Sequence, residues 1–475
     1  MAAESEERFA AYVEAISAAL GHADRRGPFR DYCLGLLMPV ERKSVEPLAA
    51  FTAPSRAAAQ HQSLLHFVGQ GGWSDDRMMS VVRDQVLPSI ERHGAIKAWI
   101  IDDTGFPKKG KHSVGVARQY CGQLGKQDNC QVAVSLSIAN HAASLPIAYR
   151  LYLPEDWTSD PERRSKAGVP DDVAFRTKPE IALDQIRAAL AAGIPRGTVL
   201  MDAGYGTNTK LRTAITDLGL AYAAGIQPHT SVWRSGEGPL PPKPWSGRGR
   251  PTSRLRRDAE HQPVKVKDLA MSLSASAWET VTWREGSAGQ LTSRFARLRV
   301  RVAHRDEKLK EGRLEEWLLV EWPKDEEQPT KYWFSTLPES ISFTHLVNAT
   351  KLRWRIERDY QDLKQEVGLG HYEGRGWRGF HHHATLCIAA YGFLISERGA
   401  LPPSGWPANR KLPQATISPR GRPAPATAPS RTACSELDRH HSTETHCRPG
   451  QDAQPLSMLP RPAPNSSNRP SLMTQ

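Results

Sequence analysis

The sequence contains no apolar run that approaches the roughly 20 residues of a membrane-spanning helix. Its first residues are acidic and amphipathic, whereas a secretory signal peptide begins with basic residues followed by an apolar stretch. The six cysteines are scattered and form no CxxC pair, which argues against a disulfide framework and against a zinc site. We therefore expect a cytoplasmic protein with free thiols and no membrane partner.

Positive charge is the main compositional feature that is present. Lysine and arginine outnumber aspartate and glutamate by 63 to 51, which gives a formal net charge of +12. The sequence pI is about 9.4, whereas hydrophobic residues make up an ordinary 39% of the chain. This balance favours a polyanionic partner such as nucleic acid, although it carries no information about the fold.

The character of the sequence changes several times along the chain, and the changes suggest domain boundaries. Apolar residues recur at helical spacing before residue 95, and the N-terminal helices either read DNA ends or cap the core. Residues 401–475 contain 14 of the 36 prolines, so we expect this tail to be dispensable. The predicted parts are an N-terminal helical domain (1–95), the first part of an α/β core (96–227), a β-rich insertion (228–340), a C-terminal helical part of the core (341–400) and a disordered tail (401–475).

Acidic residues stand where two of the predicted strands end. The apolar run 98–101 is followed by Asp102 and Asp103, and the run 199–201 is followed by Asp202. Functional groups in open α/β sheets gather at strand ends, where their side chains share a crevice. These acids are therefore candidate site residues, although an acid after a strand is also a common turn former.

A helix is predicted between these two strands. Thr177 and Glu180 have the spacing of a capping box, and Gly193 stands where such a helix would end. Strands separated by a helix indicate a mixed α/β sheet domain.

A third acid, Glu357, lies on a predicted amphipathic helix. Arg353, Glu357 and Lys364 line up beside the apolar stripe of this helix. Two magnesium ions about 3.5–4 Å apart activate the attacking oxygen and stabilise the leaving oxygen of a phosphodiester, and two or three carboxylates are enough to hold them. The carboxylates therefore suit metal-dependent phosphodiester chemistry, although Arg353–Glu357 also fits an ordinary surface ion pair.

The residues around Glu357 resemble the signature of transposases in the IS4-like superfamily of bacterial insertion sequences. That signature is tyrosine, two residues, arginine, three residues, glutamate, six residues and lysine. Arg353, Glu357 and Lys364 match it, whereas Thr350 stands in the place of the tyrosine. The segment that begins at Asp202 resembles the one that bears the second catalytic aspartate of that superfamily.

Longer stretches are most similar to the IS701 family within this superfamily. They are 102–110, 113–120 and 371–375. The resemblance implies a DDE transposase with an RNase H-like mixed-sheet core, in which Asp103, Asp202 and Glu357 are catalytic and bind Mg²⁺, with Mn²⁺ as a substitute. The 155 residues from Asp202 to Glu357 leave room for an inserted β-rich segment.

The resemblance also implies the partners and the setting of the protein. The expected partners are the ends of a DNA element and a target DNA, to which the 3′ ends are joined after cleavage. A second copy of the chain is expected in the DNA complex, and the expected location is the nucleoid in a bacterial cytoplasm. The basic residues expected at DNA phosphates are Lys108, Lys109, Lys111, Arg353 and Lys364.

Two alternative functions remain open at this point. One is a stand-alone nuclease that cuts without joining, and the other is an inactive, transposase-derived protein that only binds DNA. The presence of Asp103, Asp202 and Glu357 argues against the second alternative. Seven of the 13 tryptophans fall in the predicted insertion, and the sequence does not choose which of them, if any, stacks on a flipped base.

The adjacent acids Asp102 and Asp103 are expected to have different roles. Successive residues of an extended strand point to opposite faces, so the two side chains do not both reach one crevice. In the resembling family the catalytic acid directly precedes a threonine or a similar small residue, which selects Asp103. Asp102 is then expected to be a turn residue or to support the site from behind Asp103, for example by fixing the loop that carries Lys108 and Lys109.

Overall fold

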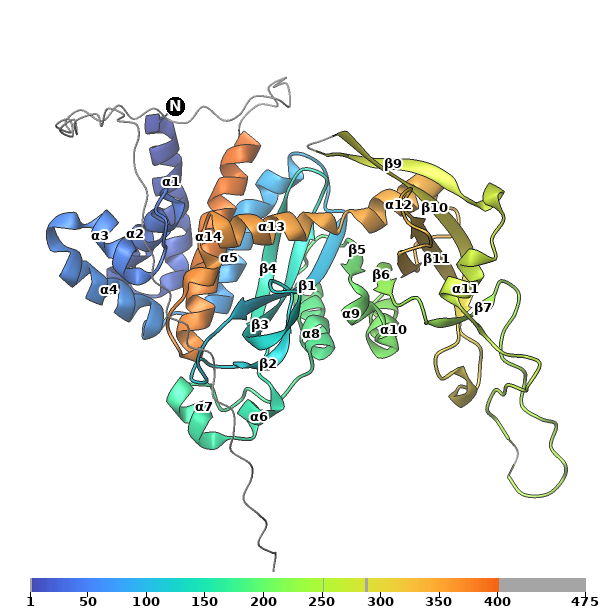
Figure 1. Ribbon diagram of the computed structural model, residues 1–475. Helices are drawn as coiled ribbons and strands as arrows, with labels where there is room; N and C mark the ends of the chain where they lie inside the picture. The colour runs from blue at the N-terminus through green and yellow to red at the C-terminus, as the bar shows by residue number, and fades with distance from the viewer. Residues whose placement is uncertain (1, 251, 287–288, 401–475) are drawn as a thin grey trace, which may run out of the picture. The chain divides into compact units, whose positions relative to one another are not determined.

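Helices form the N-terminal part of the chain in the computed structural model, which describes residues 2–250, 252–286 and 289–400 (Figure 1). They are α1 (Ala2–Ser17), α2 (Arg26–Leu37), α3 (Val45–Thr52), α4 (Ala57–Gly69) and α5 (Asp75–Glu91). Their buried residues share one apolar core with those of the central sheet and of α14 (Trp377–Ala400). None of the described helices has the length and apolarity that crossing a bilayer requires. The tail predicted at 401–475 lies outside the described residues.

The central sheet combines parallel and antiparallel strands. Its first strands are β1 (Ala98–Pro107), β2 (Ala117–Cys121), β3 (Lys126–Ala139), β4 (Ser144–Leu151), β5 (Thr198–Met201) and β6 (Tyr222–Ile226). β1 pairs antiparallel with β3 and parallel with β5, and β5 pairs parallel with β6. The carboxyl ends of β1, β5 and β6 therefore lie at the same edge of the sheet. This arrangement confirms the predicted mixed α/β fold and agrees with the RNase H-like core that the resemblance implies.

The two faces of β1 are covered by different helices. Trp99 donates from Nε1 to the carbonyl oxygen of Pro195, just beyond α8 (Lys178–Ala191), at 2.9 Å. Asp102 lies opposite Ser135 of β3, and Ser135 is hydrogen-bonded to Tyr360 of α13 (Trp354–Gln365). Because side chains alternate along a strand, one face of β1 meets α8 and the other meets α13. The remaining helices of this part are α6 (Glu155–Thr158), α7 (Pro161–Ala167), α9 (Ala203–Gly206) and α10 (Thr209–Asp217).

Helix α8 begins and ends at the predicted signals. The backbone N–H of Thr177 donates to Glu180 Oε2 at 2.8 Å, which completes the capping box. At the other end Gly193 has a φ of +67°, in the left-handed region that follows many helices and that glycine adopts without strain. The helix prediction is therefore confirmed, and its first residue, Lys178, is fixed in place.

The predicted insertion is rich in strands, and its strands continue the central sheet. The elements are β7 (Ser231–Arg234), β8 (Val264–Lys265), α11 (Val266–Met271), β9 (Glu279–Gly286), β10 (Gly289–Val302), β11 (Glu315–Trp322) and β12 (Lys331–Ser335). β12 pairs antiparallel with β6, with Phe334 opposite Ala224, and the order continues through β11, β10, β7 and β8. The edge of β6 is thus covered by a strand that lies far along the chain. The exact domain boundaries stay predictions.

The C-terminal helical part predicted at 341–400 begins with two separate helices. α12 (Phe343–Lys351) and α13 are separated by Leu352 and Arg353. The predicted apolar stripe of α13 is buried, with Ile356 and Leu363 both at 0% exposure. The interruption places Arg353 immediately before α13, close to β1.

Candidate active site

The predicted carboxylates lie close together in the sheet, beside the end of β5. Asp202 directly follows β5, as predicted, whereas Asp102 and Asp103 lie within its parallel neighbour β1, which continues to Pro107. The prediction that a strand ends just before Asp102 is therefore wrong. The side chain of Asp202 accepts a hydrogen bond from the backbone N–H of Tyr205 at 3.1 Å, which caps the short helix α9. Glu357 reaches the same region from the first turn of α13.

A close backbone approach fixes the segment that carries Asp202. A Cβ atom on Gly206 would lie 2.0 Å from the carbonyl oxygen of Gly225 in β6, and a Cβ atom on Gly225 would lie 2.8 Å from the backbone nitrogen of Ala203. Any larger residue at either glycine would push this segment away from β6. The position of Asp202 therefore depends on two residues that carry no functional group.

Arg353 joins two of the acids. Its Nη2 lies 2.9 Å from Asp102 Oδ1, and its Nη1 lies 3.3 Å from Glu357 Oε1. The Glu357 side chain is 69% exposed, so it reaches into solvent beside a guanidinium group that is mostly buried. Asp102, Arg353 and Glu357 thus form a chain of charges on the α13 side of β1.

Asp103 has a different partner on the other side of β1. Its Oδ2 lies 2.7 Å from the Nζ of Lys178, the first residue of α8. Lys178 is absent from the sequence-predicted site, although a signal for it exists. A cation in the first turn is unfavourable beside the helix dipole, so a lysine directly after a capping threonine calls for an acidic partner.

Burial and neighbouring carboxylates raise the pKa of Asp102 to about 7. Removal from water is the larger cause, Asp202 and Asp103 add repulsion, and Arg353 opposes the shift. A divalent cation would relieve this repulsion, and Mg²⁺ needs only one or two carboxylates because it keeps several waters. The chemistry of these oxygen donors therefore suits a divalent metal. Within the described residues, however, no three His, Cys, Asp or Glu side chains are gathered closely enough to hold a metal together.

An open cavity of about 400 Å³ lies beside these acids. Residues of the core and of the insertion line it, among them Asp202, Trp283, Trp333, Lys351, Arg353, Trp354 and Glu357. Lys351 holds the two parts together, since its Nζ lies 2.9 Å from Glu321 and 4.2 Å from the centre of the Trp283 ring. Of the insertion tryptophans, Trp283 and Trp333 are the ones that reach this cavity. The sequence gives no signal for this choice.

The predicted phosphate-binding residues fall into two groups. Lys108 and Lys364 are partly buried, and each Nζ donates to a backbone carbonyl, of Tyr372 at 3.0 Å and of Gly105 at 3.1 Å. Burial lowers the pKa of both lysines. Lys109 and Lys111 are exposed on the segment after β1, and Arg353 is held by the two acids described above.

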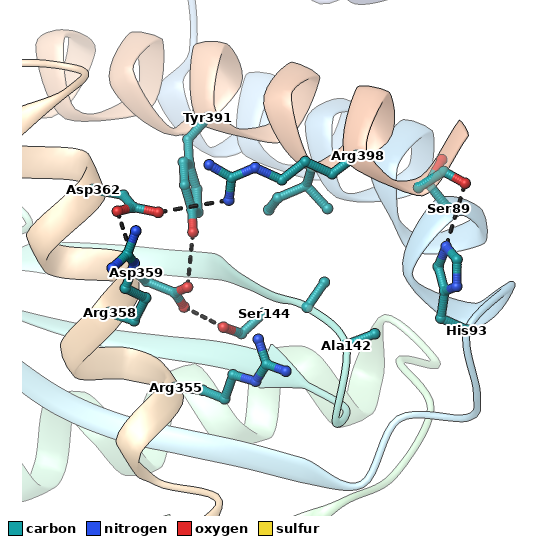
Figure 2. A pocket seen from close by; sticks show the side chains of 13 residues that line it. Ser89, His93, Ala142, Ser144, Arg355, Arg358, Asp359, Asp362, Tyr391 and Arg398 are labelled. Carbon is teal, nitrogen blue, oxygen red and sulfur yellow. Dashed lines mark hydrogen bonds and ion pairs between the residues drawn. The ribbon is translucent and has the colours of Figure 1, made fainter. Parts of the chain in front are cut away.

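The far side of α13 is held by a second cluster of polar residues (Figure 2). Buried Asp359 accepts hydrogen bonds from Ser144 Oγ at 2.5 Å and from Tyr391 Oη at 2.9 Å. Asp362 pairs with Arg358 at 3.0 Å and with Arg398 at 3.6 Å. These residues line a cavity of about 320 Å³. They tie the helix that carries Glu357 to β4 and α14.

Comparison with known proteins places this chain in a family. The chain matches the DDE superfamily endonuclease family over residues 15–290, more than half of its length, a span that contains Asp103 and Asp202 and ends before Glu357. It is also 30% identical over 200 residues to a protein of Microchaete diplosiphon described as "Probable transposase for insertion sequence element IS701". That similarity covers 42% of this chain and 48% of the relative, so the chain spans about half the length of the curated relative it matches. The chain belongs to the DDE superfamily of endonucleases.

Proposed function

We propose that this protein is a transposase that cleaves DNA at the ends of an insertion element and joins the 3′ ends to a target DNA. The observation that carries the proposal is the meeting of three elements at one sheet edge. The acids of β1, Asp202 after β5 and Glu357 on α13 all lie there, and Asp202 and Glu357 line one cavity. The similarity to an IS701 transposase supports the joining step as well as the cut.

Asp103, Asp202 and Glu357 are proposed as the ligands of the metal. DDE endonucleases typically use a divalent metal, and the hard carboxylate oxygens here suit Mg²⁺, with Mn²⁺ as a substitute. The metal, when bound, would activate the attacking oxygen and stabilise the leaving oxygen of the phosphodiester. Arg353 orients Glu357, and the Lys178 ammonium holds Asp103 in place until a ligand replaces it.

The basic residues predicted from the sequence are proposed to hold the DNA backbone. Lys109 and Lys111 are free to meet phosphates at the outset, whereas Lys108, Arg353 and Lys364 do so by sharing or exchanging their present partners. Two DNA ends require two sites, so the active complex is proposed to be a homodimer associated with the nucleoid.

Cleavage of the DNA that flanks this reading frame tests the proposal. The purified protein is expected to cut a labelled flanking duplex only when Mg²⁺ or Mn²⁺ is added. Asp202→Asn and Glu357→Gln are expected to abolish cutting while duplex binding persists, because each removes a metal ligand and leaves the basic surface intact. Asp217→Asn serves as the matched control, since it neutralises an exposed carboxylate at the end of α10 that does not line the cavity.

The products distinguish transposition from simple cutting. A strand-transfer assay with unlabelled target DNA is expected to yield joined products. Cutting without joining identifies a stand-alone nuclease instead. Binding without any metal-dependent cut would contradict the proposed enzyme and leave a DNA-binding protein.

A further inference from the structure

A long segment of the insertion runs between β7 and α11, and Figure 1 shows it as an excursion from the strands. Its two ends are held together at the base, where Leu240 and Arg256 form an isolated antiparallel bridge. The next residue, Arg257, pairs at 2.5 Å with Asp306, which is 1% exposed. We call residues 240–250 and 252–256 the arm, and its base is firmly attached to the insertion.

The tip of the arm is closed by its own hydrogen bonds. Trp245 donates from Nε1 to the carbonyl oxygen of Gly249 at 3.0 Å, and Thr252 donates from Oγ1 to the carbonyl oxygen of Lys243 at 3.2 Å. Gly247 and Gly249 have φ values of +83° and +73°, which glycine adopts without strain. The tip therefore has a defined turn that presents its side chains outward.

Every ionisable side chain of the arm is a cation. The arm contains five lysine and arginine residues and no aspartate or glutamate. One of them, Arg256, pairs with Asp258 at 3.4 Å. The side chains of the other four are exposed and form no hydrogen bond or ion pair with any described residue; these residues are Lys243, Arg248, Arg250 and Arg254. Cations that no carboxylate neutralises attract polyanions and bind phosphates.

An aromatic ring lies among these cations. The Trp245 side chain is 58% exposed although tryptophan is normally among the well-buried residues. Because its N–H is already bonded within the arm, the ring offers mainly its apolar face to a partner. Aromatic faces between cations are typical of surfaces that contact nucleic acid, where the cations bind phosphates and the ring packs on a base or a sugar.

We propose that the arm is a second DNA contact of this protein, in which its four unpaired cations bind the phosphates of a duplex and Trp245 packs against it. No described residue of the arm lines the cavity that holds Asp202 and Glu357, so this contact lies outside the catalytic cavity. The inference rests on the proposed function, which supplies DNA as the partner. Phosphate contacts carry no base information, so the arm binds duplexes of any sequence.

A triple variant, Arg248→Gln with Arg250→Gln and Arg254→Gln, tests the electrostatic part. Binding of a fluorescein-labelled duplex of arbitrary sequence is followed by anisotropy across a salt series. Each lost phosphate contact lowers the slope of log affinity against log salt by about 0.9, so three lower it by about 2.7. At about 50 mM salt the affinity is expected to fall at least tenfold.

The matched control removes the same charge elsewhere. The control combines Arg187→Gln, Arg196→Gln and Lys210→Gln, which replace exposed cations in and around α8 and α10. This control lowers the net charge by the same amount as the triple variant of the arm. This control is expected to keep the wild-type slope. Trp245→Ala is expected to weaken binding about fivefold with an unchanged slope, because stacking releases no counterions.

The outcomes separate this inference from the proposed function. Wild-type affinity and slope in the triple variant would overturn the proposal that the arm binds DNA. An equal loss of affinity in the control variant would overturn it as well. A wild-type protein that binds no duplex at low salt overturns the proposed function together with the arm. Metal-dependent cutting at low salt and saturating protein checks that the triple variant is folded and active, since it keeps every carboxylate.

Discussion

Asp102 and Asp103 are neighbours in the sequence with separate environments in the structure. Asp102 pairs with Arg353 at 2.9 Å on the α13 side of β1, and Asp103 pairs with Lys178 at 2.7 Å on the α8 side. The motif selects Asp103 as the metal ligand, whereas the contact through Arg353 links Asp102 to Glu357. A side-by-side comparison of the two asparagine variants decides between them.

We expect Asp103→Asn to abolish metal-dependent cleavage. Asp102→Asn is expected to retain measurable cleavage, lowered about 10- to 100-fold, because Arg353 loses the partner that orients it. The measurement is the initial rate of cutting of a labelled duplex by each purified variant, with duplex binding as the control. The reverse ranking would mean that the acid on the α13 side of β1 is the ligand and that Asp103 only anchors α8.

The pH dependence of stability offers a test at Asp359. Burial raises the pKa of this carboxyl to about 7, well above the ordinary value near 4. Between these two values the folded protein holds a proton that the unfolded chain has lost, so the contribution of Asp359 to stability declines as the pH rises from about 4 to about 7. Asp359→Asn is expected to remove this decline.

Urea unfolding at several pH values measures this effect as the difference between the wild type and the variant. Ser144→Ala provides a second check, because its hydroxyl lowers the pKa of Asp359 and its loss moves the decline to higher pH. Parallel curves for the wild type and Asp359→Asn would contradict the buried, proton-binding carboxyl.

Local patterns in the sequence are enough to find the acids but not their partners. Asp202 is predicted from the end of a strand and Glu357 from a motif, and both are short-range signals. Lys178 and Lys351 meet their partners only after the sheet has formed, 75 and 30 residues away along the chain. Pairings of this kind depend on tertiary packing, which no local spacing encodes.

The start of α8 determines where Lys178 stands relative to Asp103, so its cap is a useful place for a test. Thr177→Ala removes the side chain of the capping box and is expected to lower the free energy of unfolding by about 1 kcal/mol. Thr177→Ser keeps the hydroxyl and is expected to retain most of this stability. Urea unfolding of both variants measures the difference, and equal losses would show that the capping hydroxyl is not the cause.

Individual elements were accessible from the sequence to different degrees. The capping box and Gly193 mark both ends of α8, since caps are local chemistry. The apolar stripe predicts the helix that carries Glu357, but it gives no signal that the chain turns at Leu352 and Arg353 just before that helix. The pairing of β12 with β6 joins strands about a hundred residues apart, and alternating apolar residues do not specify which strand lies beside which.

The exposed arm and the continuous sheet together lead to a prediction for limited proteolysis of residues 2–400. Trypsin is expected to cut early after Arg248 and Arg254, which are exposed, whereas Lys243 and Arg250 precede prolines and resist cleavage. The two large fragments are expected to co-elute on a sizing column, because β7 before the arm pairs with β10 after it.

Denaturing and native separations of the same digest measure this outcome. Arg248→Gln combined with Arg254→Gln is expected to slow the first cut, which ties the nick to the arm. Fragments that separate without denaturant would contradict the pairing of β7 with β10.

The hydrogen-bonded seam between β6 and β12 also affects how such a protein can be recombined with its relatives. The insertion cannot be exchanged as an independent unit, because its strand β12 pairs with the edge of β6, which belongs to the core. Gly225 of this same strand also supports the segment of Asp202. A chimaera with a foreign insertion would therefore have to inherit β6 with it, and productive crossovers are expected upstream of Tyr222 instead of at the edges of the inserted sequence.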